Sequence, residues 1–599
     1  MLEPVLILTL TLPTQIQFID ATTAAGLDGI SATRVALVDL DGDTRPDAVI
    51  DRTRVFLNRP NDDGDGVRFV EVDRPNLPPV HAGDCLVFAD LDNDGRCDAI
   101  VARNVTDKVD PVLPTAWCPG LGDGTFAAAI AIPAALPKTT ACIAVGDINL
   151  DGLPDLYLGN WYTRYGESLE AYTNDLLIQQ RGDDGSVRFE RQPLPEDRFT
   201  FDEQRDGAGR PTYGALIARL GTADGVPEGG PSILELNYGR RANRLWTLSG
   251  SGKSSPIWID AAPAWHIDGD DIRHGRYPEW LKERARTDPR FDRADEKPFR
   301  AHGNTFDACV GDFNRDGRFD LLITEITHAW AGDSSDRTRI LLQEPADPTE
   351  CSSLSDRYAT EADQPPFGRR FVSDPGCSLD RIPDDASVHN WNQGDLFGQF
   401  ADFDLDGRLD VLISSGDYPD NQRLRVWHQL EDGRLVDVTS WAGLNNDGSQ
   451  QISLGDIDLD GDVDILVGQS FFRYGAADKA GRTPSLKVYL NQAIERGRHR
   501  SLTLLFTGDP QRGVHRDALG AIARVEADLD GDGPGAVITQ IGQLVGIGGH
   551  AGKQMAFELC FGLGLADHAE RVTIWWPGQS EPSVLEHVAP GRHVVQVGR

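Results

Sequence analysis

Residues 402–410 read Asp402-Phe-Asp404-Leu-Asp406-Gly407-Arg-Leu-Asp410, with carboxylates at loop positions 1, 3, 5 and 9 and glycine at position 6. Ca²⁺ takes six to eight oxygen ligands at flexible geometry, and glycine allows the backbone to reverse in a tight loop. Five further stretches share this pattern, and we predict that all six bind Ca²⁺ through Asp39, Asp41, Asp43 and Asp47; Asp90, Asp92, Asp94 and Asp98; Asp147, Asn149, Asp151 and Asp155; Asp312, Asn314, Asp316 and Asp320; Asp402, Asp404, Asp406 and Asp410; and Asp456, Asp458, Asp460 and Asp464. Such repetition indicates a repeat architecture with about six structural ions.

An EF-hand is the main alternative for such a loop, and position 12 argues against it. An EF-hand needs a bidentate glutamate at position 12 and a helix on each side. Here position 12 is apolar in every copy, namely Ile50, Val101, Leu158, Ile323, Ile413 and Val467. Position 2 is apolar as well, and the short apolar runs after each loop are typical of buried strands. Each loop is therefore predicted to join two strands of one sheet.

The composition restricts the class of function. Lys and Arg total 58 and Asp and Glu total 94, which gives a net charge of −36. This charge argues against nucleic acid and against an anionic membrane surface as partners. No run approaches the roughly 20 apolar residues of a membrane span. Residues 1–17 include a short apolar stretch without a basic region before it, so they are either a signal-peptide remnant or a first strand.

The eight cysteines permit disulfides. Cys85 and Cys142 each stand five residues before a loop and occupy equivalent places in neighbouring repeats, while Cys351 and Cys377 lie within one long insertion. We consider a Cys85–Cys142 bridge and a Cys351–Cys377 bridge, with unpaired buried thiols as the alternative.

The repeat is longer than its loop, and its spacing predicts the number of units. Neighbouring loops begin 51, 57 and 54 residues apart, but 165 residues separate Asp147 from Asp312. A degenerate copy without the carboxylates, at residues 218–236, fits inside that gap. The apolar or aromatic segments that open each unit begin at Phe18, Phe69, Phe126, Phe189, Ile257, Phe371 and Leu435. Seven units of about four strands predict an all-β, seven-bladed β-propeller, with the strand near Phe18 completing the last blade.

The Asp-x-Asp-x-Asp-Gly-x-x-Asp units resemble FG-GAP/VCBS repeats, the calcium-loop propeller modules of integrin α-chain heads. The resemblance covers residues 18–495. It implies an integrin-α-like propeller with Ca²⁺ in its blade loops. The first copy departs from the pattern, since Thr44 stands at position 6, and we expect a weaker site there.

Two insertions interrupt the repeats, at residues 260–305 and 344–397. Long irregular insertions on a rigid scaffold often carry binding or catalytic groups. The candidates in or near them are His274, His302, His328, Trp330 and His389. The simpler interpretation is that these rings pack and hydrogen-bond to order the insertions.

The pattern changes at residue 500, where short strands alternate with glycine-rich turns. Residues 516–525, Phe561-Gly-Leu-Gly564 and Ile574-Trp-Trp-Pro-Gly578 resemble the ASPIC/UnbV domain over nearly all of 500–599. That domain commonly follows FG-GAP/VCBS repeats in secreted proteins similar to cartilage acidic protein. Asp528-Leu-Asp530-Gly-Asp532 mimics a calcium loop, but position 9 is Ala536, so a hairpin turn is the preferred interpretation.

Two classes of function remain open. The first is a secreted, extracellular or periplasmic binding or adhesion module, in which Ca²⁺ is structural and the partner is a protein, a polysaccharide or a larger extracellular assembly. The second is an extracellular polysaccharide-active enzyme with a site on one propeller face, using His302 and His389 with Arg300 or Asp395. The sequence contains no Gly-x-Ser-x-Gly elbow, His-Glu-x-x-His motif or P-loop, so no catalytic or cofactor-binding residue is assigned. Docking of the C-terminal domain onto the propeller is a third possibility.

Overall fold

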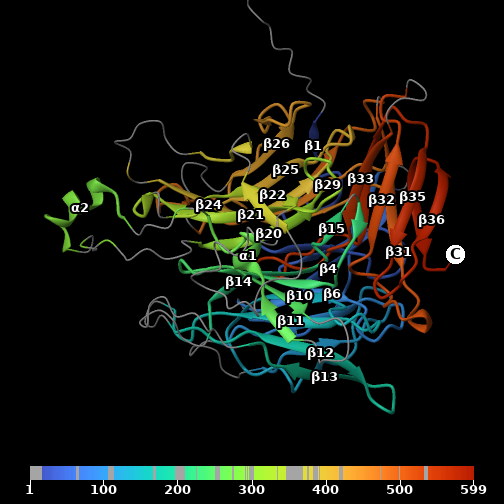
Figure 1. Ribbon diagram of the computed structural model, residues 1–599, viewed down its shortest axis with the longest axis horizontal. Helices are drawn as coiled ribbons and strands as arrows, with labels where there is room; N and C mark the ends of the chain where they lie inside the picture. Colours follow the sequence, from blue (N-terminus) through green and yellow to red (C-terminus); the bar gives the residue numbers. More distant parts are fainter. Residues whose placement is uncertain are drawn as a thin grey trace, which may run out of the picture.

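A computed structural model describes residues 16–598 except 62–65, 82, 106–112, 166–169, 196–208, 224, 250–256, 271, 273–275, 290–291, 293–294, 296–302, 333–334, 346–368, 374–376, 382–388, 390, 417–422, 473, 498 and 532–536. The predicted all-β class is confirmed, because strands form nearly every regular element of these residues (Figure 1). Only two short α-helices are present among them, α1 (Ala262–Trp265) and α2 (Glu279–Ala285), and both lie in the first insertion. Among the described residues, no helix has the length and apolar character to span a membrane.

Most strands belong to seven consecutive antiparallel four-stranded units. The first three units comprise β2 (Val35–Val38), β3 (Asp47–Ile50), β4 (Arg54–Pro60) and β5 (Val67–Glu71); β6 (Cys85–Ala89), β7 (Asp98–Ala102), β8 (Ala116–Cys118) and β9 (Ile130–Ala131); and β10 (Thr140–Gly146), β11 (Asp155–Asn160), β12 (Asp175–Arg181) and β13 (Val187–Gln192). The fourth unit comprises β14 (Thr212–Ala218), β17 (Ser232–Asn237), β18 (Arg244–Ser249) and β19 (Ile257–Asp260), with the small hairpin β15 (Thr222–Ala223) and β16 (Val226–Pro227) in place of a calcium loop.

The remaining three units follow the same order. They comprise β20 (Thr305–Gly311), β21 (Asp320–His328), β22 (Arg339–Pro345) and β23 (Arg369–Ser373); β24 (Asn392–Ala401), β25 (Asp410–Ser415), β26 (Leu424–Gln429) and β27 (Leu435–Asp437); and β28 (Ser449–Gly455), β29 (Asp464–Gln469), β30 (Lys487–Asn491) and β1 (Phe18–Asp20). The predicted role of the first strand is confirmed, because Phe18 of β1 pairs with Asn491 of β30. The fifth and sixth units are also joined, since Ile326 of β21 pairs with Gly394 of β24.

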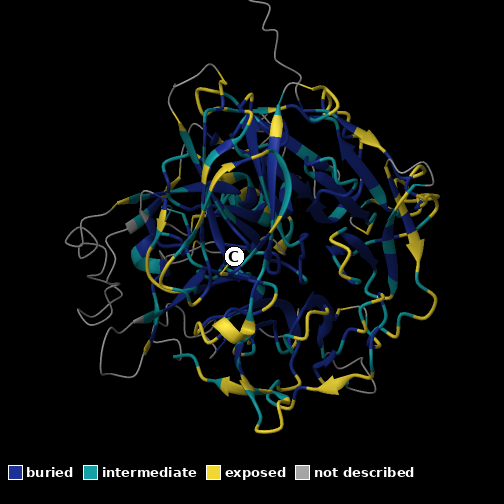
Figure 2. Cartoon of the chain, turned by 90° about the vertical axis from the view of Figure 1, so that its right-hand side faces the viewer, coloured by how far each residue is buried: buried dark blue, intermediate teal, exposed yellow. Residues whose placement is uncertain are grey.

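The sequence repeat is one strand out of phase with the sheets. The segments predicted to open each unit, such as Phe69, Phe189 and Leu435, lie in the fourth strand of the preceding sheet. These outer strands are partly exposed, whereas first strands such as β6 and β10 are entirely buried. Figure 2 shows this gradient, with buried strands inside and exposed strands at the rim.

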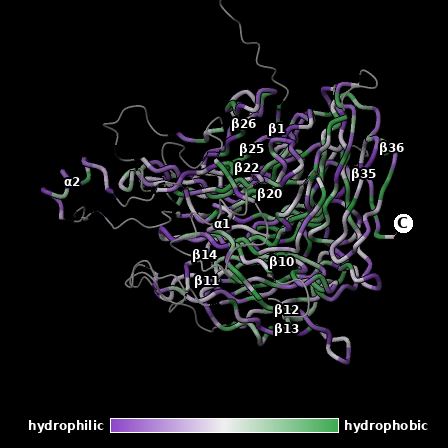
Figure 3. Tube along the Cα trace, in the orientation of Figure 1, coloured by the Kyte–Doolittle hydropathy of each residue, from purple (hydrophilic) through white to green (hydrophobic). Residues whose placement is uncertain are grey.

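Each sheet packs on the next through its own apolar cluster. One cluster joins Val38 and Val55 of the first unit to Phe88 of the second, and another joins Leu37 and Ile50 of the first unit to Leu466 of the last. Five further clusters join the remaining neighbours in order. Burial of this apolar surface is the main favourable contribution to folding. Figure 3 shows the hydrophobic residues along inner strands such as β10 and β20.

The C-terminal part forms two smaller sheets. The strands are β31 (Arg500–Thr507), β34 (Glu558–Gly564) and β37 (Gly591–Gln596) in one sheet, and β33 (Ile538–Gln543), β32 (Ile522–Ala527), β35 (Ala569–Trp575) and β36 (Ser583–Val588) in the other, with a 3₁₀ turn at Pro510–Arg512. This part lies over the end of the seven units that carries the acidic loops, on the side opposite α2 (Figure 1). The amide of Asp90, for example, donates to Asp517 Oδ2 at 2.7 Å, and the amide of Arg516 donates to Asn93 Oδ1 at 2.9 Å.

A segment between the two C-terminal sheets, residues 546–557, reaches the first strands of five units. We call it the central segment. Its contacts are Gln554 with Phe88 of β6, Gly549 with Ala215 of β14, Lys553 with Asp307 of β20 and Gly398 of β24, and Ala556 with Leu454 of β28. Lys553 Nζ lies 2.6 Å from Asp307 Oδ2, and both side chains are buried. Because removal of either partner would leave a buried charge, this ion pair fixes the position of the segment.

The Cys85–Cys142 bridge considered from the sequence is absent. Both residues are buried free thiols, on β6 and β10 of neighbouring units. The Cys85 thiol instead donates a hydrogen bond to the Ala141 carbonyl at 3.2 Å. Cys351 lies outside the described residues, so its pairing with Cys377 stays a prediction.

Candidate metal centres

All six acidic loops connect the first and second strands of a sheet, as predicted. Position 1 follows the first strand directly, and position 9 is the first residue of the second strand, as with Asp402 after β24 and Asp410 at the start of β25. Leu405 at position 4 has φ 60° and Gly407 at position 6 has φ 84°. Both values lie in the left-handed region, where glycine carries no steric penalty. The sharp reversal turns positions 1, 3 and 5 toward one another.

The aspartate at position 9 makes the same two hydrogen bonds in every loop. One oxygen accepts the amide at position 2, and the other accepts an amide in the third strand or, for Asp98, two residues after it; for Asp410 these donors are Phe403 at 3.1 Å and Gln429 at 2.9 Å. The equivalent pairs of bonds are made by Asp47, Asp98, Asp155, Asp320 and Asp464. This residue therefore holds the loop against two strands at once, whether or not an ion is bound.

The aspartate at position 1 is oriented by the loop backbone. In four loops its two oxygens accept amides from positions 5 and 6, as in Asp90, where Asp94 N lies at 3.0 Å and Gly95 N at 2.7 Å. In the first loop Asp39 accepts the amides of positions 4 and 6 instead. The first three carboxylates then converge, with ligand atoms within 4.8 Å of one another in 39–43, 90–94 and 402–406. Hard oxygen ligands in this arrangement are the kind that Ca²⁺ prefers.

Burial affects the charge of these carboxylates strongly. Removal from water raises the pKa of Asp47 and Asp90 to about 8 and that of Asp98 and Asp312 to about 7. Neighbouring aspartates raise it further, because a second negative charge disfavours ionisation. A bound divalent cation would offset both effects. Without one, the native loops disfavour their own ionised state.

The first loop differs from the others. Thr44 at position 6 has φ 69°, a strained conformation for a β-branched residue. Arg59 forms ion pairs with Asp41 and, at 2.8 Å, with Asp43. A guanidinium already lies against two of the predicted ligands, which supports the expectation of a weaker site.

The loop at 402–410 has a partner that the motif did not reveal. His428 Nδ1, on β26, lies 3.0 Å from Asp410 Oδ1 and 3.9 Å from Asp404 Oδ2. Burial lowers the pKa of His428, but the hydrogen bond to Asp410 and the charges of Asp404 and Asp406 outweigh it and raise the pKa to about 9. The equivalent position is apolar in other units, for instance Leu57. A histidine at this otherwise apolar position was the sequence feature that could have revealed the contact.

The last loop is tied to the C-terminal part. Arg592 Nη1 lies 2.7 Å from Asp456 Oδ2 and 2.8 Å from Glu558 Oε2, and all three side chains are largely buried. Arg592 also donates to the Thr44 carbonyl at 3.0 Å. One guanidinium therefore connects the first loop, the last loop and β34.

A second set of bonds connects neighbouring units. The residue of the third strand that bonds position 9 is often Asn or Gln, and its side-chain amide reaches the loop of the preceding unit. Asn58 donates to the Ile457 carbonyl at 2.7 Å, Gln429 to Phe313 at 3.0 Å and Asn491 to Phe403 at 2.9 Å. Order in one loop is thus linked to order in the next unit.

The histidines and tryptophans of the insertions engage in packing where they are described. His389 stacks on Trp280 of α2 with ring centroids 4.4 Å apart, and His328 stacks on Trp330 at 5.6 Å. Asp395, named for the enzymatic alternative, is buried and pairs with Arg381. His274, Arg300 and His302 lie outside the described residues, as does Ala536 at position 9 of the loop-like turn.

Comparison with known protein families gives two matches. Residues 402–467 match the FG-GAP-like repeat, and residues 511–597 match the ASPIC and UnbV domain. The chain thus combines an FG-GAP-like repeat at 402–467 with a C-terminal ASPIC and UnbV domain, which confirms both resemblances over these residues. No curated protein matches the chain.

Similar solved structures are distant. A RAG complex with one melted and one unmelted RSS is 10% identical, with 68% of this chain and 94% of that chain covered and a TM-score of 0.26. The Vibrio cholerae biofilm matrix protein Bap1 is 12% identical, with 79% and 91% covered and a TM-score of 0.30. The exotype rhamnogalacturonan lyase YesX is 15% identical, with 74% and 79% covered and a TM-score of 0.29. These TM-scores are too low to support any inference.

Proposed function

We propose that residues 18–495 form a seven-bladed β-propeller and that residues 500–599 cap the face carrying its acidic loops. Seven four-stranded units in chain order among the described residues, each packed on the next, support this arrangement, and β1 would close the ring through its pairing with β30. Radial closure protects the sheet edges. The central segment would then occupy the axis, where it bonds to the first strands of five blades.

We further propose that the six loops hold structural Ca²⁺. The observation that carries this proposal is the repeated frame, in which position 9 bonds two strands and positions 1, 3 and 5 converge. Loops of this short type suit the millimolar Ca²⁺ found outside the cytosol. We therefore propose a secreted or periplasmic location.

Calcium stoichiometry tests the ligand assignment. In the full chain at saturating Ca²⁺, the variant Asp406→Ala is expected to bind one ion fewer than the wild type, measured by atomic absorption after gel filtration. The control is Asp530→Ala, in the loop-like turn of the C-terminal part, which should leave the number of ions unchanged. An unchanged number in Asp406→Ala would show that position 5 is not a ligand.

The remaining proposal concerns the partner. The C-terminal part covers the acidic loops, so we propose that an extracellular protein or polysaccharide binds the opposite face, where the insertions lie. Phe472 follows β29 at the end away from the loop, and its side chain is 85% exposed. Exposed aromatic rings offer large contact area at low entropic cost.

An array of extracellular proteins and polysaccharides, probed with the calcium-loaded chain, tests this face. The variant Phe472→Ser is expected to lose at least tenfold in affinity for a bound species while its melting temperature is unchanged. The control is Trp441→Ser, an exposed aromatic residue that follows the outer strand β27. Equal binding by wild type and Phe472→Ser would place the contact elsewhere.

A further inference from the structure

Two histidines and a glutamate meet on the edge hairpin of the C-terminal part, away from the acidic loops. The hairpin consists of β35 and β36, at the right-hand edge of Figure 1. Ala569 pairs with Val588 and Arg571 with Glu586, so the register places Glu570 opposite His587. His568 stands in the bend one residue before β35, and its ring reaches the Glu570 carboxylate from there.

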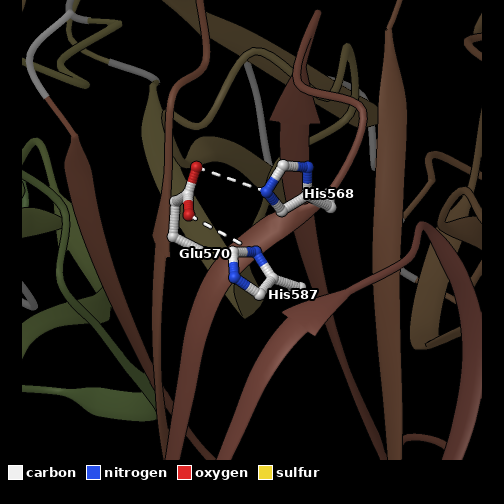
Figure 4. A group of neighbouring side chains, drawn as sticks. All are labelled: His568, Glu570 and His587. Carbon is white, nitrogen blue, oxygen red and sulfur yellow. Dashed lines mark ion pairs between the residues drawn. The ribbon is translucent and has the colours of Figure 1, made fainter. Parts of the chain in front are cut away.

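The three side chains point toward one another (Figure 4). His568 Nε2 lies 3.3 Å from Glu570 Oε1, and His587 Nδ1 lies 3.6 Å from Glu570 Oε2. The three ligand atoms fall within 4.8 Å of one another. Ligand atoms bound at 2.0–2.2 Å to a tetrahedral Zn²⁺ are about 3.3–3.6 Å apart. The observed separations are thus close to those that a bound ion would require.

A fourth residue orients the first histidine. Asp567 Oδ1 lies 2.5 Å from Nδ1 of His568. A carboxylate that accepts the Nδ1 proton fixes the tautomer and leaves Nε2 as a lone-pair donor directed at Glu570. Histidines that bind zinc commonly have such a carboxylate partner.

We propose that His568, Glu570 and His587 form a Zn²⁺ site, with His568 Nε2, a Glu570 oxygen and His587 Nδ1 as ligands and Asp567 as the positioning residue. Imidazole nitrogen selects a borderline transition metal such as Zn²⁺, whereas the all-oxygen loops select Ca²⁺. The site is therefore chemically distinct from the acidic loops.

The fourth coordination position faces solvent. The side chains of His568 and Glu570 are 32% and 43% exposed, and that of His587 is 72% exposed. Three protein ligands with one open position leave room for water or for a side chain of a second molecule. The same exposure means that the ligands can be substituted without disturbing a core.

Zn²⁺ titration of the full chain in millimolar Ca²⁺, which keeps the acidic loops occupied, tests the site. One equivalent of Zn²⁺ is expected to bind the wild type. Competition with a chromophoric chelator measures this binding. His568→Ala and His587→Ala should each weaken binding by at least about 100-fold, and Asp567→Asn by about 10-fold with the stoichiometry retained. Co²⁺ in the same site should give the visible absorption of a tetrahedral complex.

His593→Ala is the matched control, since His593 is a half-buried histidine of the same domain whose Nε2 lies 2.8 Å from the Ala589 carbonyl. It should bind Zn²⁺ like the wild type. All variants should keep the melting temperature of the calcium-loaded chain, which shows that they fold. Zn²⁺ uptake that is absent in the wild type, or unchanged in both His568→Ala and His587→Ala, overturns the proposal and leaves the calcium assignment untouched.

Discussion

Transfer of the calcium-loaded chain into EGTA is expected to lower its melting temperature by about 16 °C. A ligand that binds only the native state at 100 times its Kd contributes roughly 2.7 kcal/mol per site. Unfolding entropy of about 2.1 cal/mol/K per residue converts the contribution of six sites over residues 18–495 into a shift of that order. The chain loses stability without calcium because the carboxylates of each loop repel one another when the ions leave.

Differential scanning calorimetry at constant ionic strength measures this shift. Adding excess Ca²⁺ back should restore the melting temperature. Mg²⁺ at the same concentration should restore little of it, because Mg²⁺ demands octahedral geometry and dehydrates reluctantly. Equal rescue by both ions would indicate general charge screening, and an unchanged melting temperature in EGTA would contradict the calcium proposal.

The calcium-free chain should also respond to pH in a defined direction. Burial raises the pKa of Asp47 and Asp90 from the ordinary value of 3.8 to about 8. Between these values the native state binds more protons than the unfolded state, so the free energy of unfolding decreases as pH rises. In EGTA the melting temperature should therefore fall from pH 5 to pH 8, and the difference from the calcium-loaded chain should widen. A rise in EGTA would contradict the raised pKa values.

The acidic loops and their flanking strands could be predicted because their signals are local. Asp402 to Asp410 lie within nine residues, and the apolar residues at positions 2 and 12 are part of the same short stretch. Pairing of β1 with β30 was also predictable. The strand that precedes the first unit has no sheet of its own, and the last unit lacks a fourth strand that it can supply. The assignment of the outer strands to their sheets was harder to predict. The strand at Phe69 comes just before the second loop in the sequence, but it pairs with β4 of the first sheet.

Contacts between distant residues could not be predicted. Lys553 pairs with Asp307, and Arg592 pairs with Asp456. The sequence around each residue contains no signal that identifies its distant partner. The sequence suggested docking of the C-terminal domain only as one possibility. It gave no indication that the central segment makes the contact. His428 was missed for a similar reason, because it approaches the loop from the third strand, 18 residues after Asp410.

Among single substitutions, Asp410→Ala is expected to destabilise the calcium-loaded chain strongly, by about 3–6 kcal/mol. Asp410 is fully buried and accepts the amides of Phe403 and Gln429. Each buried donor left without a partner costs roughly 1–3 kcal/mol. His428 also loses the hydrogen bond at 3.0 Å that favours its protonated form. Urea unfolding followed by fluorescence measures the loss.

Repeating the comparison in EGTA separates the two roles of Asp410. The unpaired amides persist without calcium, whereas the loss of a ligand affects only the loaded chain, so the destabilisation should be smaller in EGTA. Asp432→Ala is the control, because Asp432 lies in the exposed turn after β26 of the same unit and pairs with the exposed Arg434; it should not change the unfolding midpoint measurably. If Asp410→Ala costs the same in both conditions, Asp410 is a structural hydrogen-bond acceptor and not a ligand. A cost no larger than that of Asp432→Ala would contradict both roles.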